Sequence, residues 1–506
     1  MVKTEAPRQV NGNKLAKDLT WLAVLALGLS GEVGAGIFYV SAQVQGIVPG
    51  VGPNVPLALI VDGLVAAFLA ITYWYFSSSI AGAGGEYLFV SRTLGARFGF
   101  IVHLIAWLGG TASVGFLAHT APSFLASALN LLSPGSGHWF ATNIGSFVTG
   151  VVLIWLAWWV HVRGIKHVGT ALQVAMWVIL ASGFLVMVMG FTHTPAMLNA
   201  ALLAKTHLSA ASLMAAGAKS TPTSLAFFEA LPVLYFAYAG LRGATYAGGE
   251  TNSAKKVVGK SILGLLVLVA VYYVTFAFAL YHVAPWQLVA GLIKTHHGSM
   301  ASASALVGLL LPQWLGVTLN FAVALIVFKT ILPGMMTQSR LLLSFAADGI
   351  LPSSLAKLTP QQTPIVALTI GASLSTIVLV ETALTGSAFG LASGVLASTL
   401  VHAALGIGMI LMPYRAPDLF AANTTWIKEH RIIQWFVGLM MVLIALSLAY
   451  LVVLPSLGSY WLFNPLVQVI LFSIFGSVLY QLYWRKVVAS GGQKEHDERF
   501  RSEPSL

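Results

Sequence analysis

Among the ionisable residues within long apolar stretches of the sequence, four are candidates for function: Glu32, Asp62, Arg242 and Lys329. An ionised side chain at the centre of a bilayer costs about 2.5–3.5 kcal/mol on insertion scales, so such residues are rare and usually functional. A buried carboxyl group can take up and release a proton, because burial disfavours its charged form. A buried lysine either loses its proton or finds a partner. We therefore predict coupling or gating roles for these four side chains.

Each of the four also has a structural interpretation. Glu32 could form a salt bridge that holds its surroundings together, and Asp62 could be structural in the same way. Arg242 could anchor a helix at the inner leaflet, where basic residues are favoured. On the functional interpretation, Lys329 exchanges partners with Glu32 or Asp62 during a cycle, Glu32 carries a proton, and Arg242 forms an inner gate.

Glu32 stands in a run of glycines at positions 28, 31, 34 and 36. Each glycine costs about 1 kcal/mol relative to alanine within a helix, so a helix that contains this run is expected to unwind. Unwound backbone exposes N–H and C=O groups, which a membrane protein tolerates only where they line a cavity or bind a ligand. The alternative is that the small residues only allow two helices to pack closely.

A second candidate break covers residues 236–243, which read Phe-Ala-Tyr-Ala-Gly-Leu-Arg-Gly. It lies five predicted spans after the first, so the two stretches have opposite orientations in the membrane and indicate an inverted repeat. Substrates of such folds bind at the midplane between the breaks. The free N–H groups of the first break suit the carboxylate of an amino acid. The free carbonyl groups near 236–238 suit an ammonium group.

The elements that must hold these residues are membrane-spanning helices. Of the 506 residues, 58% are hydrophobic and 8% are charged, whereas soluble proteins carry about 25% charged residues. This composition excludes an ordinary cytosolic enzyme. Apolar runs of the length that crosses a bilayer predict twelve helices, at 19–47, 55–79, 97–131, 143–161, 167–191, 224–247, 257–283, 313–338, 364–382, 387–413, 432–455 and 462–484. The polar stretches 192–223 and 284–312 are expected to hold short surface helices.

The basic residues indicate how the chain is oriented. The net charge is +11, but lysines and arginines cluster between apolar runs, which is typical of loops that face anionic lipid and not of nucleic-acid binding. If the N-terminus is cytoplasmic, all but four of the 26 lysines and arginines are cytoplasmic too; the exceptions are Lys205, Lys219, Lys294 and Lys329. We therefore predict that both termini are cytoplasmic. The tail from 494 to 506 mixes both charge signs and is expected to be disordered.

The chain is predicted to have four parts: a cytoplasmic N-terminal segment (1–18), a core (19–413), two further spans (within 432–484) and a cytoplasmic tail (485–506). The N-terminal segment lacks the apolar stretch of a signal peptide. The sequence contains no cysteine, which excludes disulfides and thiolate chemistry. It also lacks a P-loop motif, convincing metal-ligand spacing of histidines and a clustered nucleophile and base. We predict no enzyme activity, no cofactor and no metal.

Four motifs, in order along the chain, resemble the amino acid–polyamine–organocation (APC) transporter superfamily. The first, residues 31–38, is similar to the pattern G-x-[IV]-G-x-G-I-F. The other three are Gly84-Gly85-Glu86-Tyr87 with Arg92 and Leu94-Gly95, Phe236-Ala237-Tyr238-Ala239-Gly240 with Gly249-Glu250-Thr251-Asn252, and Ser339-Arg340-Leu341-Leu342 with Ala346-Ala347-Asp348-Gly349-Ile350-Leu351-Pro352.

The resemblance implies an all-α LeuT-type fold of twelve spans, in which spans 1–5 and 6–10 form inverted repeats and helices 1 and 6 are broken. It implies a secondary transporter that moves amino acids or related amines across the cytoplasmic membrane by alternating access. The substrate-binding residues that it implies are Gly31, Val33, Gly34, Ala35, Gly36, Ala106, Gly110, Ser113, Phe236, Ala237, Tyr238, Ala239 and Gly240.

Three departures from the family pattern bear on substrate and coupling. The family usually has an acidic residue near the end of the second break, where this chain has Arg242. Some members carry a lysine in span five that replaces a sodium ion, and the corresponding residue here is Leu180. The usual Asn-Pro of the loop reads Asn252-Ser253. By analogy with the span-five lysine, Lys329 is a candidate to replace a sodium ion from span eight.

The third predicted span supplies the side-chain end of the pocket by the same resemblance. Ala106, Gly110 and Ser113 are small and include no acidic partner for a cationic side chain, so they favour neutral amino acids. Glu32 and Lys329 favour proton-coupled symport. Leu180 favours the alternative, exchange of one substrate for another without ion coupling. An amino-acid sensor without transport is a third possibility, and the oligomeric state is not predicted.

Overall fold

The computed structural model describes residues 19–34, 36–133, 135–238, 240–251, 253–385, 391–458, 460–461 and 464–502. Helices form nearly all the regular structure of this described part, apart from an isolated bridge between Leu19 and Thr251. The long helices are α3 (Val55–Ser77), α5 (Ala96–Leu132), α7 (Asn143–Val162), α8 (Ile165–Thr192), α13 (Ala254–Val283), α16 (Gln313–Ala347), α17 (Ile365–Thr385), α18 (Leu391–Arg415), α20 (Arg431–Val453) and α21 (Pro465–Ala489).

The shorter helices lie at the two predicted breaks and in the connections. Those of the first 250 residues are α1 (Trp21–Glu32), the π-helix η1 (Gly36–Val40), α2 (Ser41–Ile47), η2 (Gly52–Asn54), α4 (Glu86–Leu94), α6 (His138–Ala141), α9 (Pro195–Thr206), α10 (Ala210–Gly217), α11 (Ser224–Tyr235), η3 (Phe236–Tyr238), α12 (Leu241–Tyr246) and η4 (Ala247–Glu250). The remainder are α14 (Trp286–Lys294), η5 (Gly298–Met300), α15 (Ala303–Leu310), η6 (Ser353–Ala356), α19 (Pro417–Ala421), η7 (Trp426–Glu429), η8 (Leu454–Gly458) and α22 (Gln493–Arg501).

Eleven helical stretches of the described part are long and apolar enough to cross a membrane. They coincide with the predicted spans except at 224–247, where the chain is divided into α11, η3 and α12 and the apolar helix α11 has only 12 residues. The all-α membrane fold is confirmed. The count of twelve spans, the inverted repeat and the breaks in helices 1 and 6 stay predictions.

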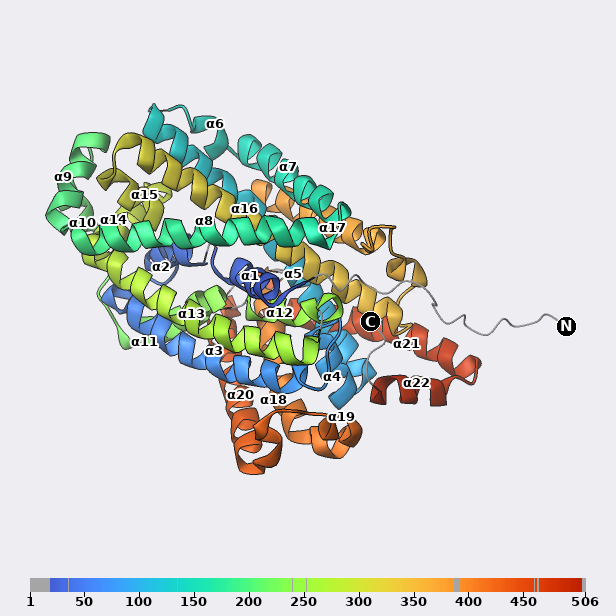
Figure 1. Cartoon of the computed structure of the whole chain (residues 1–506). Helices are drawn as coiled ribbons and strands as arrows, with labels where there is room; N and C mark the ends of the chain where they lie inside the picture. Colours follow the sequence, from blue (N-terminus) through green and yellow to red (C-terminus); the bar gives the residue numbers. More distant parts are fainter. Residues whose placement is uncertain are drawn as a thin grey trace.

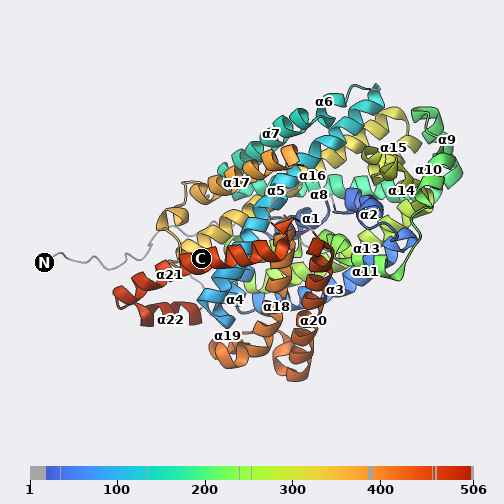
Figure 2. The same cartoon turned by 180° about the vertical axis from the view of Figure 1, so that it is seen from behind.

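The long helices run side by side, and the short connecting helices gather at their ends. In Figures 1 and 2, α9, α10, α14 and α15 lie together at one end of the bundle, and α22 lies beside α4 at the other end. The core of the bundle is the packing of α16 along α5, α18 along α20 and α13 along α3. This arrangement places the first break, between α1 and η1, close to the middle of α16.

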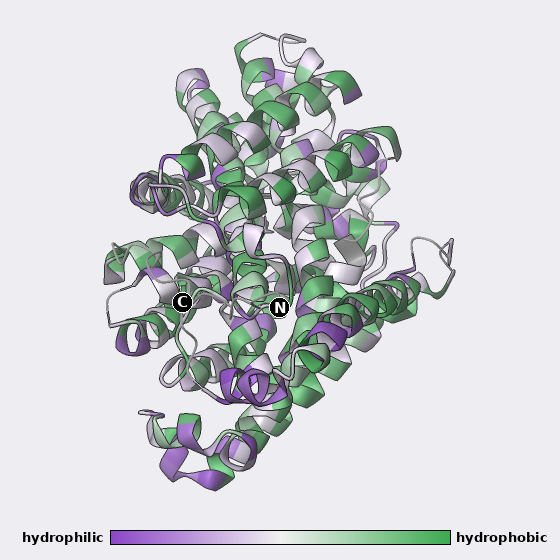
Figure 3. Ribbon diagram, turned by 90° about the vertical axis from the view of Figure 1, so that its right-hand side faces the viewer, coloured by the Kyte–Doolittle hydropathy of each residue, from purple (hydrophilic) through white to green (hydrophobic). Residues whose placement is uncertain are grey.

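The outer helices present apolar side chains on both faces, because one face meets protein and the other meets lipid. On α8, Leu172 and Ile179 are buried, whereas Val174, Trp177 and Phe184 are 60–67% exposed. Figure 3 shows the same property as hydrophobic colour along most helix surfaces. Such exposed apolar surface is expected of a chain whose solvent is the bilayer.

Short helices were predicted on the surface in the polar stretches 192–223 and 284–312. The helices are present, but one of them is buried. Helices do form in both polar stretches, as α9 and α10 in the first and α14, η5 and α15 in the second. However, residues 303–309 of α15 are all buried, so this helix is not a surface helix. Its sequence is almost entirely apolar, and it packs on α16 and α9.

Two predictions for the opposite end of the bundle are wrong: where the span at 313–338 ends, and that the tail is disordered. Helix α16 continues to Ala347 and carries Ser339–Leu342 inside it, because its residues are helix formers and no glycine intervenes before Gly349. Residues 493–501, predicted to be disordered, form α22. This helix is stable because His496 and Phe500, one helical turn apart, are both buried against aromatic rings that include Trp484.

Candidate functional site

The two predicted breaks meet backbone to backbone. A methyl group added at Gly240 would lie 2.3 Å from the carbonyl carbon of Gly31 and 2.4 Å from the amide nitrogen of Glu32. One added at Gly36 would lie 2.9 Å from the Cα atom of Ala237. Only glycine allows this approach. The glycines therefore serve close packing, and at the same place α1 ends at Glu32 and α11 ends at Tyr235.

A tyrosine that sequence reasoning missed joins the two segments. The hydroxyl of Tyr273, on α13, lies 2.7 Å from the carbonyl oxygen of Glu32 and 2.9 Å from that of Ala237. Its one proton is thus shared between the carbonyl groups of both segments, which the ends of α1 and α11 leave without helical partners. The only signal in the sequence was a hydroxyl in the middle of an apolar run.

Lys329 reaches the end of α1 from α16. Its ammonium donates to the carbonyl oxygen of Ser30 and, over 2.7 Å, to that of Val33. The side chain is 2% exposed. The last carbonyl groups of a helix carry a partial negative charge, so this is a position that suits a cation. Sequence reasoning did not foresee that Lys329 contacts the end of α1. Its exchange of partners with Glu32 or Asp62 and its role in coupling stay predictions.

Glu32 and Asp62 are both buried, and their carboxyl oxygens have no hydrogen-bonding partner among the described residues. Neither forms an ion pair with Lys329 within 4.0 Å in that part of the chain. The Lys329 charge nevertheless acts on the Glu32 carboxyl group through the protein interior. A buried carboxyl group without partners is costly, so these two groups are candidates to carry a proton.

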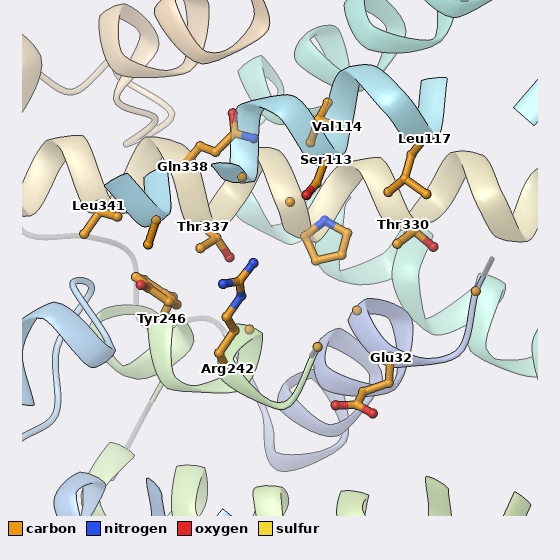
Figure 4. Close-up of a pocket in the computed structure, with 18 of the residues that line it drawn as sticks. Glu32, Ser113, Val114, Leu117, Arg242, Tyr246, Thr330, Thr337, Gln338 and Leu341 are labelled. Carbon is orange, nitrogen blue, oxygen red and sulfur yellow. The ribbon is translucent and has the colours of Figure 1, made fainter. Parts of the chain in front are cut away.

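A cavity of about 120 Å³ opens beside the first break. Its walls include nine of the residues singled out from the sequence: Gly31, Glu32, Gly34, Gly36, Ala106, Gly110, Ser113, Gly240 and Arg242. The other wall residues were not predicted as site residues, although Glu86, Gly243 and Leu341 lie in the segments singled out from the sequence. They are Glu86, Trp107, Val114, Leu117, Gly243, Tyr246, Thr330, Pro333, Gly334, Thr337, Gln338 and Leu341. Figure 4 shows this cavity between α5, α16, α12 and the end of α1.

Several predicted site residues lie outside the cavity wall. Val33 and Tyr238 are fully buried in the packing, and Tyr238 donates a hydrogen bond to the carbonyl oxygen of Leu59 on α3. Ala237 is engaged by Tyr273, as described above. Asp62 on α3 and Lys329 on α16 are buried and do not line the cavity. Ala35 and Ala239 lie outside the described residues, as does the side chain of Phe236.

Arg242 points into the cavity from α12. In Figure 4 its guanidinium group extends toward Thr337 and Ser113, whereas the Glu32 carboxyl group is directed away from Ser113. Its Nη1 atom donates a hydrogen bond of 3.2 Å to Ser398 Oγ on α18. Among the residues that the structure describes, no carboxylate lies within 4.0 Å of it. The family's usual acidic residue is therefore replaced by a cation that faces the cavity.

Glu86 is a second ionisable wall residue, at the start of α4. Burial raises the pKa of its carboxyl group, and the charge of Arg242 and a hydrogen bond from Tyr73 offset part of that effect. The hydrogen bond from the Tyr73 hydroxyl occupies Oε1. The glycine pair before Glu86 had marked this segment as a family motif, but no local pattern indicated that its carboxyl group reaches the cavity.

The remaining motif residues form buried ion pairs at the end of the bundle near α22. Arg92 donates hydrogen bonds of 2.6 and 2.8 Å to the two carboxylate oxygens of Asp348, and Tyr87 donates one of 2.6 Å. Arg340 pairs with Glu250, with a distance of 3.0 Å from Nε to Oε1. These pairs connect α4 to the end of α16 and the C-terminal part of α16 to η4.

Comparison with known proteins gives one family across almost the whole chain. Residues 19–481 match the family described as "Amino acid permease". Among curated proteins, the branched-chain amino acid permease BcaP of Bacillus subtilis (strain 168) is 24% identical over 368 residues, which are 70% of this chain and 72% of that protein. The vacuolar cationic amino acid transporter 8 of Arabidopsis thaliana is 23% identical over 389 residues, 75% of this chain and 61% of that protein. The methylthioribose transporter of Bacillus subtilis (strain 168) is 24% identical over 361 residues, 70% of this chain and 72% of that protein.

Proposed function

We infer that this chain, which belongs to the amino acid permease family, is a multi-pass membrane protein that transports amino acids by alternating access. The observation that carries the proposal is the cavity at the meeting point of the two glycine-rich segments. Backbone groups without helical partners occur inside a membrane only where they line a cavity or bind a ligand. In many transporters the substrate lies at such discontinuous helices.

The two segments offer complementary groups to an amino acid. N–H groups beside Gly34 and Gly36 suit the carboxylate. Carbonyl groups of the second segment suit the ammonium group, apart from that of Ala237, which accepts a hydrogen bond from Tyr273. The third-span residues Ala106, Gly110 and Ser113 border the cavity, which supports the predicted class of neutral amino acids. Arg242 in the same cavity disfavours a cationic side chain by repulsion.

Proton-coupled symport is the proposed mode of transport. Glu32 is buried at the cavity wall, and the ammonium of Lys329 is held by the carbonyl groups of Ser30 and Val33, on either side of Glu32 in the chain. A proton taken up by Glu32 would change the charge next to Lys329, and hence the contact between α1 and α16. The second candidate is substrate exchange without ion coupling, which Leu180 on α8 favours. We further propose that the protein lies in the cytoplasmic membrane with both termini in the cytoplasm.

Uptake by purified protein in proteoliposomes tests the transport function. A panel of labelled amino acids is offered, and at least one is expected to enter faster than into protein-free liposomes. Gly110→Phe fills the cavity and should abolish that uptake. Gly264→Phe is the matched control, because a side chain added there meets open space on an exposed face of α13. No uptake of any amino acid by folded wild-type protein would overturn the proposal.

A further inference from the structure

Arg242 has more hydrogen-bond donors in the cavity than the protein satisfies. A guanidinium group carries five N–H donors in a planar fork and has no acceptor. Within the part of the chain that the structure describes, these donors form one hydrogen bond, from Nη1 to Ser398 Oγ. The remaining donors face the cavity, whose walls come from α5, α12, α16 and the end of α1, and the Arg242 side chain is partly exposed there. A guanidinium group in such surroundings favours a ligand that brings oxygen acceptors.

The nearest candidates within the protein do not supply those acceptors. Glu86 influences Arg242 electrostatically but lies beyond 4.0 Å of it, and Oε1 of Glu86 already accepts the proton of Tyr73. The Glu32 carboxyl group is directed away, behind the end of α1. Arg242 is therefore not a closed ion-pair gate in this conformation. The positive charge of Arg242 faces any ligand that is bound in the cavity.

The wall around the guanidinium group is polar in a way that fits a side chain ending in oxygen. Thr337 and Ser113 lie on the side toward which Arg242 points. Gln338, one residue further along α16, is 3% exposed, and both atoms of its amide group lack a hydrogen-bonding partner in the described part of the chain. In Figure 4 this amide group is directed away from the Arg242 guanidinium group, and its Oε1 atom lies 2.8 Å from where a methyl group at Gly371 on α17 would be, so Thr337 and Ser113 alone supply the polar wall beside Arg242.

We propose that Arg242 binds the end of the substrate's side chain, and that the substrate is an amino acid whose side chain ends in a carbonyl oxygen. This group is either a carboxamide, which keeps the substrate within the neutral class, or a carboxylate. The proposal rests on the proposed transport function and narrows its substrate. The α-carboxylate and α-ammonium groups lie at the two breaks, and the side chain extends along α12 toward Arg242.

Selectivity follows from the cost of leaving Arg242 unpaired. An apolar side chain in the cavity would remove water from the guanidinium group and return no acceptor, and sites of this kind reject analogues that lack the hydrogen-bonding group. A lysine or arginine side chain would meet a like charge at short range. Between the two accepted groups, a carboxylate forms the stronger, bidentate contact with arginine.

Ligand-induced thermal stabilisation of the purified protein tests the inference. The probes are L-glutamine, L-glutamate and L-norleucine, whose unbranched side chain resembles that of glutamine in length but has no acceptor. Wild-type protein is expected to bind glutamine or glutamate at least tenfold more tightly than norleucine. Whichever of the two binds more tightly identifies the accepted group.

Arg242→Met should remove that preference and leave norleucine binding unchanged. Arg163→Met is the matched control, because Arg163 lies over the ring of Trp159 and away from the cavity. If Arg242→Met does not fold, Arg242→Lys keeps a positive charge without the planar fork and should lose most of the preference for glutamine. Equal binding of all three probes by wild-type protein, or an unchanged preference in the Arg242 variants, would overturn the inference. If none of the probes binds and no other amino acid is transported, the transport function fails as well.

Discussion

The ammonium group of Lys329 keeps its two hydrogen bonds only if it moves together with the carbonyl groups that accept them. Both of them, the carbonyl oxygens of Ser30 and Val33, belong to the end of α1, whereas the lysine belongs to α16. Any tilt of α1 relative to α16 therefore breaks or remakes these two bonds. The Lys329 charge therefore links the position of α1 to the charge state of neighbouring groups. Glu32 is the carboxyl group on which it acts.

Substitution of Lys329 tests this coupling. Lys329→Met keeps the length of the side chain but removes the ammonium group, so the two carbonyl groups lose their donor. We expect accumulation of substrate in response to a proton gradient to fall at least tenfold, while exchange of substrate across the membrane remains. Lys357→Met, at an exposed position beyond η6, should change neither. Glu32→Gln is expected to behave like Lys329→Met; if both variants retain proton-driven uptake, these residues have no part in coupling.

The contact between the two glycine-rich segments makes a prediction about stability. Gly240→Ala places a methyl group 2.3 Å from the backbone of Gly31, which forces the segments apart. We expect a loss of about 1–3 kcal/mol in the free energy of unfolding, as is typical of overpacking. Gly243→Ala, three residues along on α12, meets nothing within 4 Å and should leave it nearly unchanged. Chemical unfolding of both variants in detergent gives the comparison, and equal stability would show that the segments are less tightly apposed than we describe.

At the scale of single residues, the sequence predicted the charged residues at the centre of the site but not all the residues that line the cavity. Glu32, Arg242 and Lys329 stood out because a charge in an apolar run is costly. Glu32 and Arg242 line the cavity, and Lys329 contacts the end of α1. Tyr273, Gln338 and Glu86 could not be found in this way. A tyrosine or glutamine in a span is unremarkable, and only the packing of α13, α16 and α4 shows what each one faces.

The helices at the end of the bundle near α22 are joined by charges as well as by apolar packing. Asp348, at the end of α16, accepts two hydrogen bonds from Arg92 and one from Tyr87 on α4. The α22 helix closes over this pair, because Arg499 donates a 3.0 Å hydrogen bond to the carbonyl oxygen of Asp348 and the Phe500 ring lies 4.9 Å from the Arg92 guanidinium carbon. The tail thus has a folded contact with the transporter core.

Neutralising Asp348 should destabilise this end of the molecule strongly. Asp348→Asn leaves the buried Arg92 charge without its counter-charge, a change that typically costs about 3–5 kcal/mol. Thermal unfolding in detergent measures the effect. Asp497→Asn on α22 is the control, because that side chain is 63% exposed and should matter little. A similar unfolding temperature for both variants would contradict the role given to the Arg92–Asp348 pair.

Most helix boundaries could be predicted because the apolar runs end at glycine, proline or charge. The exceptions have a common physical reason. Helix α16 continues past 338 because Arg340, which suggested an end, is buried and paired with Glu250. Helix α22 forms because His496 and Phe500 find an aromatic surface. Both features depend on partners that are distant along the chain, which a local pattern cannot reveal.

The proposed orientation of the whole molecule rests on its charges, and the chain is well suited to a direct test. It contains no cysteine, so single cysteines can be introduced without a background. Ser136, in the connection between α5 and α6, and Ser490, after α21, are both exposed. In intact cells, Ser136→Cys should react with a membrane-impermeant maleimide, and Ser490→Cys should react only after permeabilisation. The reverse pattern would show that the termini lie outside the cytoplasm.

The central claim is that a proton gradient drives an amino acid through the cavity between the two breaks. The most direct measurement is uptake of the bound amino acid into proteoliposomes that carry an imposed inward proton gradient and contain no substrate. One proton crossing 100 mV supplies about 2.3 kcal/mol, which supports roughly 50-fold accumulation of a neutral substrate. We predict that the gradient alone drives accumulation in the wild-type protein and fails to do so in Lys329→Met. Uptake that occurs only when unlabelled substrate is loaded inside would contradict this account and identify the protein as an exchanger.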